Sequence, residues 1–207
     1  AHLASDHYPV VASLTIDTTK IKKDPCGNTK IAIMGASNEV EPSYANYLKG
    51  TCPGSAIKVF AENGFSIQQQ KAKYIDTNEI VNFKPDILII DPSGNSCGGN
   101  DPVNSGIATL KEIKNIVSQW QPVPVTALLT ISPRHKKENN VISELSYQSC
   151  VNEFNSQMSS LNNPETPKVI LISLSSVLGG NPAYSCKYCN KEPNSDEYIH
   201  WTDAGDK

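Results

Sequence analysis

The chain has 207 residues and a formal net charge of −3, with 38% hydrophobic and 19% charged residues. This length and composition fit one globular domain with a sizeable core. The charge balance offers no basic footprint for nucleic acid or for an anionic membrane surface. No apolar run approaches the roughly 20 residues that a membrane-spanning helix needs. We therefore expect no nucleic-acid partner and no membrane span.

The first 25 residues differ in pattern from the rest of the chain. Between Tyr8 and Ile21 the sequence is rich in Val, Thr and Ile, and apolar residues alternate with Thr and Asp. This alternation is typical of an extended arm or an edge strand rather than a helix. Pro25, Cys26 and Gly27 then mark the start of the main domain. We expect an N-terminal arm over residues 1–25 and one domain over residues 26–207.

From Lys30 onward, short apolar runs rich in β-branched residues alternate with stretches of helical periodicity. The helices are expected at about Tyr44–Lys49, Ile67–Phe83, Ile107–Trp120 and Val141–Leu161. The five buried strands are expected at Ile31–Met34, Ile57–Ala61, Ile87–Ile90, Val123–Ile131 and Val169–Leu174. Strands that alternate with helices predict an α/β fold with a doubly wound, flavodoxin-like parallel sheet. Such sheets place their functional residues just beyond the carboxyl ends of the strands.

The cysteine content indicates an oxidising compartment. An even number of cysteines in polar loop contexts favours disulfides, so we expect a secreted or extracytoplasmic protein. The alternative is a cytosolic enzyme with reduced thiols. Cys186 and Cys189 have the spacing of half a zinc site, but the sequence lacks a second pair at similar spacing, so disulfides are preferred and no metal is expected. The six cysteines are Cys26, Cys52, Cys97, Cys150, Cys186 and Cys189.

A serine follows the first predicted strand, in the sequence Gly35-Ala36-Ser37. A serine there would sit at the mouth of the sheet, where the N–H groups of a following helix could bind an oxyanion. The competing interpretation is a helix cap, which is the commoner use of a serine in this position.

A second informative block lies at the end of the chain, in Glu197-Tyr198-Ile199-His200. An acidic residue three positions before a histidine, on a loop or a half-turn, can hydrogen-bond the imidazole and fix its tautomer. Asp196 is a neighbouring carboxylate that could take the same role.

Together these two blocks resemble those of the SGNH hydrolases, also called GDSL-like esterases. That family has Gly-Asp-Ser after its first strand and Asp-x-x-His near its C-terminus, often followed by Thr or Ser and an Ala-Gly pair. Here Ala36 and Glu197 replace the two aspartates, and Thr202 and Ala204-Gly205 follow the histidine. The resemblance covers roughly residues 30–207. It implies Ser37 as nucleophile, His200 as base and Glu197 as the orienting acid. Because the last block normally enters a closing helix, we expect that helix to be truncated.

The resemblance also implies two further oxyanion donors in the middle of the chain. After the second strand the family has a glycine, which matches Gly64, with Ser66 as an alternative. After the third strand it has an asparagine, which matches Asn95 by distance from the strand end, with Asn100 as an alternative. The oxyanion hole would then consist of the Ser37 and Gly64 N–H groups and the Asn95 side-chain amide.

The implied function is an esterase or acyltransferase that works through an acyl-enzyme without a cofactor. By family analogy the substrate would be an O-acyl ester, for example an O-acetyl group on a carbohydrate. Two alternatives remain. Gly94-Asn95-Ser96-Cys97-Gly98 matches the Gly-x-Ser-x-Gly nucleophile elbow of other hydrolases, although helix breakers follow it. The chain could also be an inactive subunit of an extracellular assembly, self-associating through its N-terminal arm.

Overall fold

The computed structural model describes most of residues 26–207. The expected arm, Ser37 and Cys186 lie outside the described residues. For residues 42–44 and 47, and for the four short strands of a second sheet, the backbone alone is described. The described residues are 26–36, 42–98, 100–131, 135–138, 141–144, 148–164, 168–174, 189–191 and 197–201.

A five-stranded parallel sheet forms the centre of the domain, in the order β2-β1-β3-β4-β7. Each strand pairs in parallel with its neighbours, as the alternation of strands and helices predicts. The predicted α/β class is therefore confirmed, and so is each of the five predicted strands. Their bounds are β1 Lys30–Gly35, β2 Ala56–Ala61, β3 Ile87–Ile90, β4 Val125–Leu129 and β7 Val169–Ile172.

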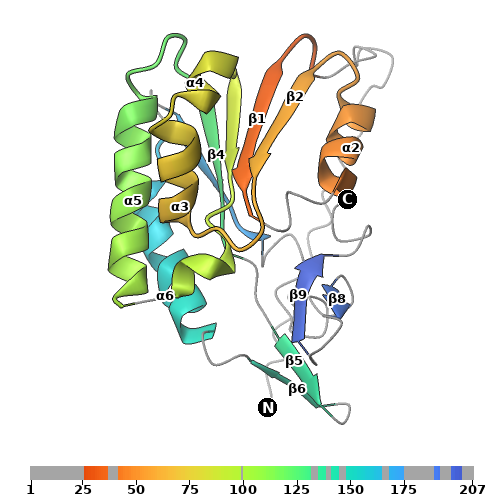
Figure 1. The fold of residues 1–207 in the computed structure, drawn as a ribbon, viewed down its shortest axis with the longest axis vertical. Coiled ribbons are helices and arrows are strands. Elements are labelled where there is room, and N and C mark those ends of the chain that lie inside the picture. Colours follow the sequence, from red (N-terminus) through yellow and green to blue (C-terminus); the bar gives the residue numbers. More distant parts are fainter. Residues whose placement is uncertain are drawn as a thin grey trace, which may run out of the picture.

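Helices cover both faces of this sheet. In Figure 1, α3, α4, α5 and α6 lie over one face and α2 lies on the other. The main core fills the space between the first group and the sheet, where Met34, Leu88 and Ile113 are buried. The helices are α2 Pro42–Thr51, α3 Ile67–Gln70, α4 Glu79–Phe83, α5 Pro102–Val117 and α6 Gln148–Met158. Shorter turns are π-helical at Lys71–Ile75 and 3₁₀ at Gly94–Cys97 and Ser159–Leu161.

The close packing of α5 on α6 depends on a glycine. A Cβ atom built at Gly106 of α5 would lie 2.3 Å from Cε2 of Phe154, which is fully buried on α6. The absence of a side chain at Gly106 therefore leaves room for the aromatic ring. The helix begins at Pro102 and continues through this glycine. The sequence predicts this helix only from Ile107, because glycine and proline weaken a helical pattern.

The predicted helix over Val141–Leu161 is wrong in its first part. Val141–Glu144 is strand β6, which pairs antiparallel with β5, His135–Glu138, and α6 starts only at Gln148. Two asparagines separate the strands in the sequence, and Glu138 lies opposite Val141. Asparagine favours hairpin turns, so this pair is the signal that the helical interpretation overlooked.

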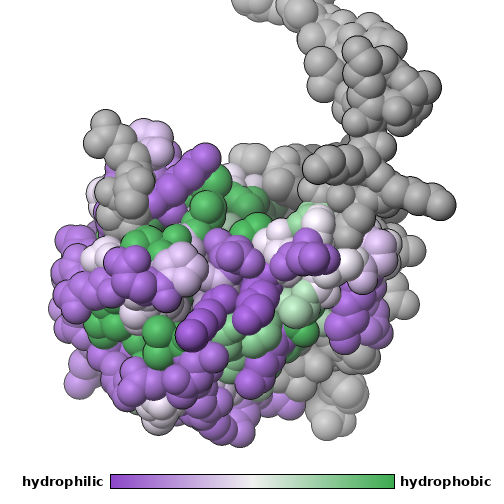
Figure 2. Space-filling model, turned by 90° about the horizontal axis from the view of Figure 1, so that it is seen from above, coloured by the Kyte–Doolittle hydropathy of each residue, from purple (hydrophilic) through white to green (hydrophobic). Residues whose placement is uncertain are grey.

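A second, antiparallel sheet of four short strands has the order β6-β5-β9-β8. Its other two members are β8, Cys189–Lys191, and β9, Glu197–Trp201. In Figure 1 this small sheet lies below the carboxyl ends of the parallel strands, on the side where β4 leads into β5. Figure 2 views the molecule from the opposite end, where hydrophilic residues cover most of the described surface and hydrophobic ones show in separate places.

Among the described residues, two disulfides link distant segments of the domain. Cys26 pairs with Cys52, which joins the segment before β1 to the end of α2. Cys97 pairs with Cys150, which joins the loop after β3 to the first turn of α6. Both are consistent with an oxidising, extracytoplasmic environment. Within the part of the chain that the structure describes, no helix is long and apolar enough to cross a bilayer.

Candidate active site

Three of the sequence blocks begin side by side at one edge of the parallel sheet. The register pairs Gly35 of β1 with Ala61 of β2, and Met34 of β1 with Ile90 of β3. Since parallel strands end at the same edge, the residues that follow β1, β2 and β3 leave the sheet as neighbours. Ser37 is the second residue after β1, although its own position is outside the described residues.

The loop after β2 carries Gly64 and leads into α3. Gly64 is exposed and has a φ of +79°, a left-handed conformation that explains the need for glycine. Ser66 caps α3: its Oγ accepts from the Gln69 N–H, and its own N–H donates to Gln69 Oε1 at 2.9 Å. Because this capping box occupies the Ser66 hydroxyl and N–H at the start of the helix, Gly64 is the better candidate of the two for the oxyanion donor after β2.

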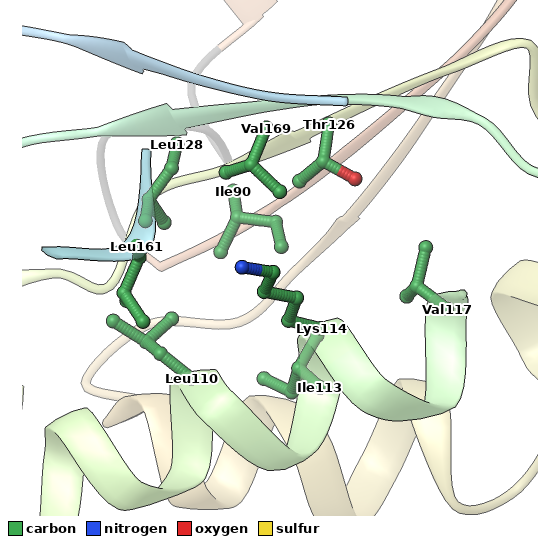
Figure 3. A pocket seen from close by; sticks show the side chains of 9 residues that line it. All are labelled: Ile90, Leu110, Ile113, Lys114, Val117, Thr126, Leu128, Leu161 and Val169. Atoms are coloured by element: carbon green, nitrogen blue, oxygen red, sulfur yellow. The ribbon is translucent and has the colours of Figure 1, made fainter. Parts of the chain in front are cut away.

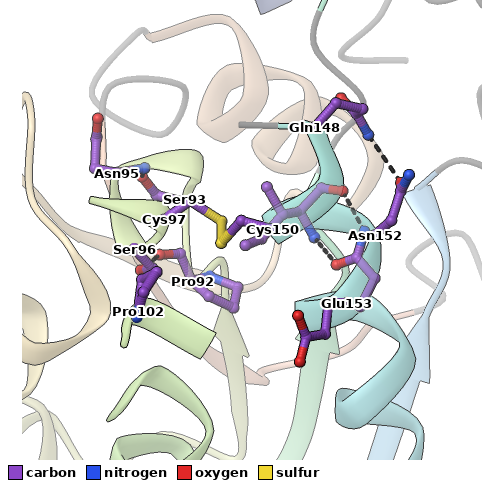
Figure 4. Close-up of a disulfide and its surroundings, with 12 residues drawn as sticks. Pro92, Ser93, Asn95, Ser96, Cys97, Pro102, Gln148, Cys150, Asn152 and Glu153 are labelled. Atoms are coloured by element: carbon purple, nitrogen blue, oxygen red, sulfur yellow. Dashed lines mark hydrogen bonds between the residues drawn. A yellow bond between two sulfur atoms is a disulfide. The ribbon is translucent and has the colours of Figure 1, made fainter. Parts of the chain in front are cut away.

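The loop after β3, from Asp91 to Cys97, is held by its own side chains. The Ser93 N–H donates to Asp91 Oδ1 at 2.7 Å, and the Asn95 N–H donates to Ser93 Oγ at 3.0 Å. Ser93 has a φ of 65°, which is uncommon for a residue other than glycine. Asn95 is half-buried, and in Figure 4 its side chain points away from the disulfide between Cys97 and Cys150.

The structure contradicts Ser96 as the nucleophile of an elbow. Ser96 is 1% exposed. Its Oγ accepts from the Ile67 N–H at 2.8 Å and donates to the Pro92 carbonyl. It also lies in a 3₁₀ turn that ends at Cys97, and α5 begins only at Pro102. The buried hydroxyl therefore joins the loop to the start of α3, and it lacks the exposed strand-to-helix turn of an elbow.

Asn100, the alternative to Asn95, lies farther from the sheet. It is exposed and comes directly before Asp101, the residue at the start of α5. Asn95 follows the end of β3 more closely and belongs to the hydrogen-bonded loop. These facts favour Asn95, while its role as an oxyanion donor stays a prediction.

The last block lies on strand β9, where the sequence led us to expect a loop or a half-turn. β9 pairs with β5, with His135 opposite Tyr198 and Lys136 opposite Glu197. β8 pairs along the other edge of β9 with an irregularity, so that Asn190 faces His200 and Lys191 faces Tyr198. Only the backbone of Glu197 and His200 is described.

An asparagine that the sequence analysis missed fixes the exit from β4 towards this small sheet. Asn155 of α6 accepts from the Ile131 N–H through Oδ1 and donates to the Ile131 carbonyl through Nδ2, both at 2.8 Å. Ile131 follows β4 and precedes β5, the strand that pairs with β9. The amide thus helps to direct β5, and with it β9, towards the carboxyl edge of the parallel sheet. A polar residue on a helix gave no sequence signal of this role.

Comparison with solved structures identifies the fold. A lipase/acylhydrolase from Enterococcus faecalis matches with a TM-score of 0.62 and 14% identity, over 86% of this chain and 89% of that one. A GDSL-like lipase from Bacteroides thetaiotaomicron matches with a TM-score of 0.61 and 12% identity, over 86% and 82%. The chain has the fold of the SGNH hydrolases.

A third similar structure is that of an acetyl xylan esterase, with a TM-score of 0.62 and 14% identity, over 86% of this chain and 93% of that one. No family model matches the sequence, and no curated protein is similar enough to count as a relative. At these identities the likeness establishes the fold and leaves the chemistry to the residues of this chain.

Charged and aromatic side chains surround the second block of the SGNH fold. Lys73 Nζ lies 2.7 Å from Glu62 Oε2, and this hydrogen bond raises the pKa of Lys73. The same Nζ lies 5.5 Å from the centre of the Phe65 ring. Burial raises the pKa of Tyr74, whose ring packs beside Phe65. These residues stabilise the turn that carries Gly64 and lie beside it.

A small hollow, partly open to solvent, lies between α5 and strands β3, β4 and β7. Aliphatic side chains line it, and Lys114 and Thr126 are its two polar residues. Figure 3 shows the Lys114 side chain reaching from α5 towards the sheet. None of the predicted site residues lines this hollow. Among the described residues, no cluster of three or more His, Cys, Asp or Glu side chains offers a metal site.

Proposed function

We propose that the chain is a secreted serine esterase or acyltransferase that acts on O-acyl esters. The observation that carries this proposal is the meeting of the blocks after β1, β2 and β3 at one edge of the sheet, with the strand of the last block attached through β5 on the same side. A nucleophile, oxyanion donors and a base are the groups that acyl transfer requires in one place.

In the proposed mechanism His200 accepts the proton of the Ser37 hydroxyl as Ser37 Oγ attacks the ester carbonyl. The N–H groups of Ser37 and Gly64 and the Asn95 amide stabilise the resulting oxyanion, each typically contributing about 3 kcal/mol to lowering the barrier. His200 then protonates the leaving alcohol as the acyl-enzyme forms. Water or an acceptor hydroxyl attacks the acyl-enzyme, releases the acid or the new ester, and restores Ser37.

A carbohydrate O-acetyl ester is the substrate that we propose. One structure with the same fold is named as an acetyl xylan esterase, which supports an acetylated polysaccharide as the substrate class. The two disulfides support an extracytoplasmic location, where such polymers occur. Both inferences rest on analogy and composition, so the test must begin with the nucleophile itself.

The deciding experiment is covalent labelling with a fluorophosphonate probe, followed by mapping of the labelled residue. We expect the label on Ser37, and we expect Ser37→Ala to abolish both labelling and hydrolysis of p-nitrophenyl acetate without lowering the melting temperature. Activity that persists in Ser37→Ala would refute the assignment. An unlabelled, inactive wild-type chain that forms oligomers would favour the non-enzymatic subunit instead.

A further inference from the structure

Gln70, the last residue of α3, is a buried amide that the proposed mechanism does not use. Its side chain is 0% exposed. Nε2 donates to the Asp91 carbonyl at 3.1 Å, whereas Oε1 has no hydrogen-bond partner in the structure described. A buried acceptor without a partner destabilises the fold, and this cost offsets the gain from the hydrogen bond that Nε2 donates.

The carbonyl that Gln70 binds belongs to the first residue of the loop that carries Asn95. Asp91 is the first residue after β3, and its N–H donates to the Met34 carbonyl of β1 at 2.9 Å. Asp91 is thus bonded through its N–H to β1 and through its carbonyl to Gln70. These two hydrogen bonds fix the direction in which the chain leaves the sheet. Two further hydrogen bonds, between Asp91 and Ser93 and between Ser93 and Asn95, then connect this first residue to Asn95.

The loop also contains backbone that needs support. Ser93 adopts a φ of 65° and a ψ of 150°, a combination that costs free energy in a residue other than glycine. Such a conformation persists only when the surroundings fix it from several sides, and it is commonest at functional sites. Here the surroundings are the Asp91 carboxylate, the Ser96 hydroxyl and the Gln70 amide.

We propose that Gln70 is a positioning residue of the active site, which holds the Asp91–Cys97 loop so that the Asn95 amide is pre-organised for the oxyanion. This proposal rests on the proposed function, since it assigns Asn95 the role of oxyanion donor. Gln70 acts through the loop and touches no reacting atom. Its polar side chain is kept in the core for the geometry of the site, with little net gain in stability.

The first test replaces Gln70 with methionine, which keeps the volume and removes the donor. We expect kcat for p-nitrophenyl acetate to fall about tenfold or more, with KM within about twofold, because an oxyanion donor acts mainly in the transition state. The melting temperature should stay nearly the same, because the variant loses the unpaired Oε1 together with the hydrogen bond to the Asp91 carbonyl. If Gln70→Met folds poorly, Gln70→Leu provides the same test. Ile80→Val, a change at a fully buried residue of α4, is the matched control: it should lower the melting temperature and leave kcat unchanged.

A double-mutant cycle with Asn95→Ala separates positioning from a general structural effect. If Gln70 works through Asn95, Gln70→Met should change kcat less than about twofold once Asn95 is already alanine. An undiminished loss in the Asn95→Ala background would overturn the proposal, as would a fall in melting temperature that accounts for the lost activity.

Hydrogen exchange of the full chain provides a readout that does not depend on catalysis. The N–H groups of Ser93, Asn95 and Ser96 are all bonded within the loop, so they should exchange faster in Gln70→Met than in the wild type. Unchanged exchange would overturn the positioning role even in an active enzyme. Faster exchange in a chain that neither labels nor hydrolyses esters would show instead that the loop is held but that the proposed function fails.

Discussion

At the scale of single residues, the proposed mechanism depends most on which acid would orient His200. Glu197 stands where the SGNH block has an aspartate, and Asp196 precedes it. The backbone of Glu197 is fixed, because it lies opposite Lys136 in the pairing of β9 with β5. Asp196 stands before the first residue of the strand. The residue within the strand is therefore the better-anchored partner for His200.

This argument predicts different effects for the two carboxylates. Glu197→Gln should lower kcat by up to about 10⁴-fold, since the imidazole would lose the group that fixes its tautomer. Asp196→Asn should leave kcat within about twofold. Steady-state kinetics on one ester would check both. The reverse order of effects would identify Asp196 as the orienting acid, and no effect from either would indicate a Ser37–His200 dyad.

Ser96 gives a second residue-scale prediction, which follows from its burial and its two hydrogen bonds. Ser96→Ala leaves the buried Ile67 N–H without a partner, so the free energy of unfolding should fall by about 1–3 kcal/mol. Denaturant unfolding would measure this loss. The fluorophosphonate label should still map to Ser37 in the folded variant, and a label that disappears together with the Ser96 hydroxyl would restore the elbow hypothesis.

At the scale of elements, the contact between α5 and α6 decides how the larger helical layer packs. Gly106→Ala would ordinarily stabilise an exposed helix by about 1 kcal/mol. Here the new methyl group would clash with the ring of Phe154, which is enclosed in the core. We expect a loss of about 1–3 kcal/mol instead, as in other overpacked cores. Thermal unfolding would show it, and Gly50→Ala on α2, where no atom lies within 4 Å, is the matched control.

The disulfide between Cys97 and Cys150 connects the Asp91–Cys97 loop to α6. Its two cysteines are 53 residues apart in the sequence, so the link restricts a long loop of the unfolded chain. Replacing both cysteines with serine should lower the free energy of unfolding by about 2–5 kcal/mol. Denaturant titration at matched pH would test this, and an unchanged midpoint would show that the bridge does not restrict the unfolded chain in solution.

At the scale of the whole molecule, the prediction concerns the redox state. The described residues contain two disulfides, so the mass of the native protein should be lower than that of the fully reduced chain by about two hydrogens for each bridge, that is by about four, or about six with a third bridge between the other two cysteines. Intact-mass measurement before and after reduction would show the difference. Six free thiols in the native material would contradict the extracytoplasmic location.

The sequence by itself determined the parallel sheet and the positions of the blocks along it. Its five strands are short and rich in apolar and β-branched residues, as is typical of a parallel sheet that helices cover on both faces, and this pattern can be recognised without knowing which strands pair. Chain order then brings Ser37, Gly64 and Asn95 after three neighbouring strands. The resemblance of the blocks to SGNH hydrolases agreed with the fold that the solved structures share.

Only the tertiary structure decided the rest. The strands of the small sheet are short and partly polar, and β5 pairs with β9 from a distant part of the chain, so the asparagine pair between β5 and β6 was the one local signal for this sheet. The contacts of the Gln70 and Asn155 side chains could not be predicted either, because the backbone groups that these amides bind lie on other elements. Ser96 fitted a catalytic motif until its burial showed otherwise. Local periodicity reports which face of an element is buried, whereas polar contacts between distant segments form only when the chain has folded.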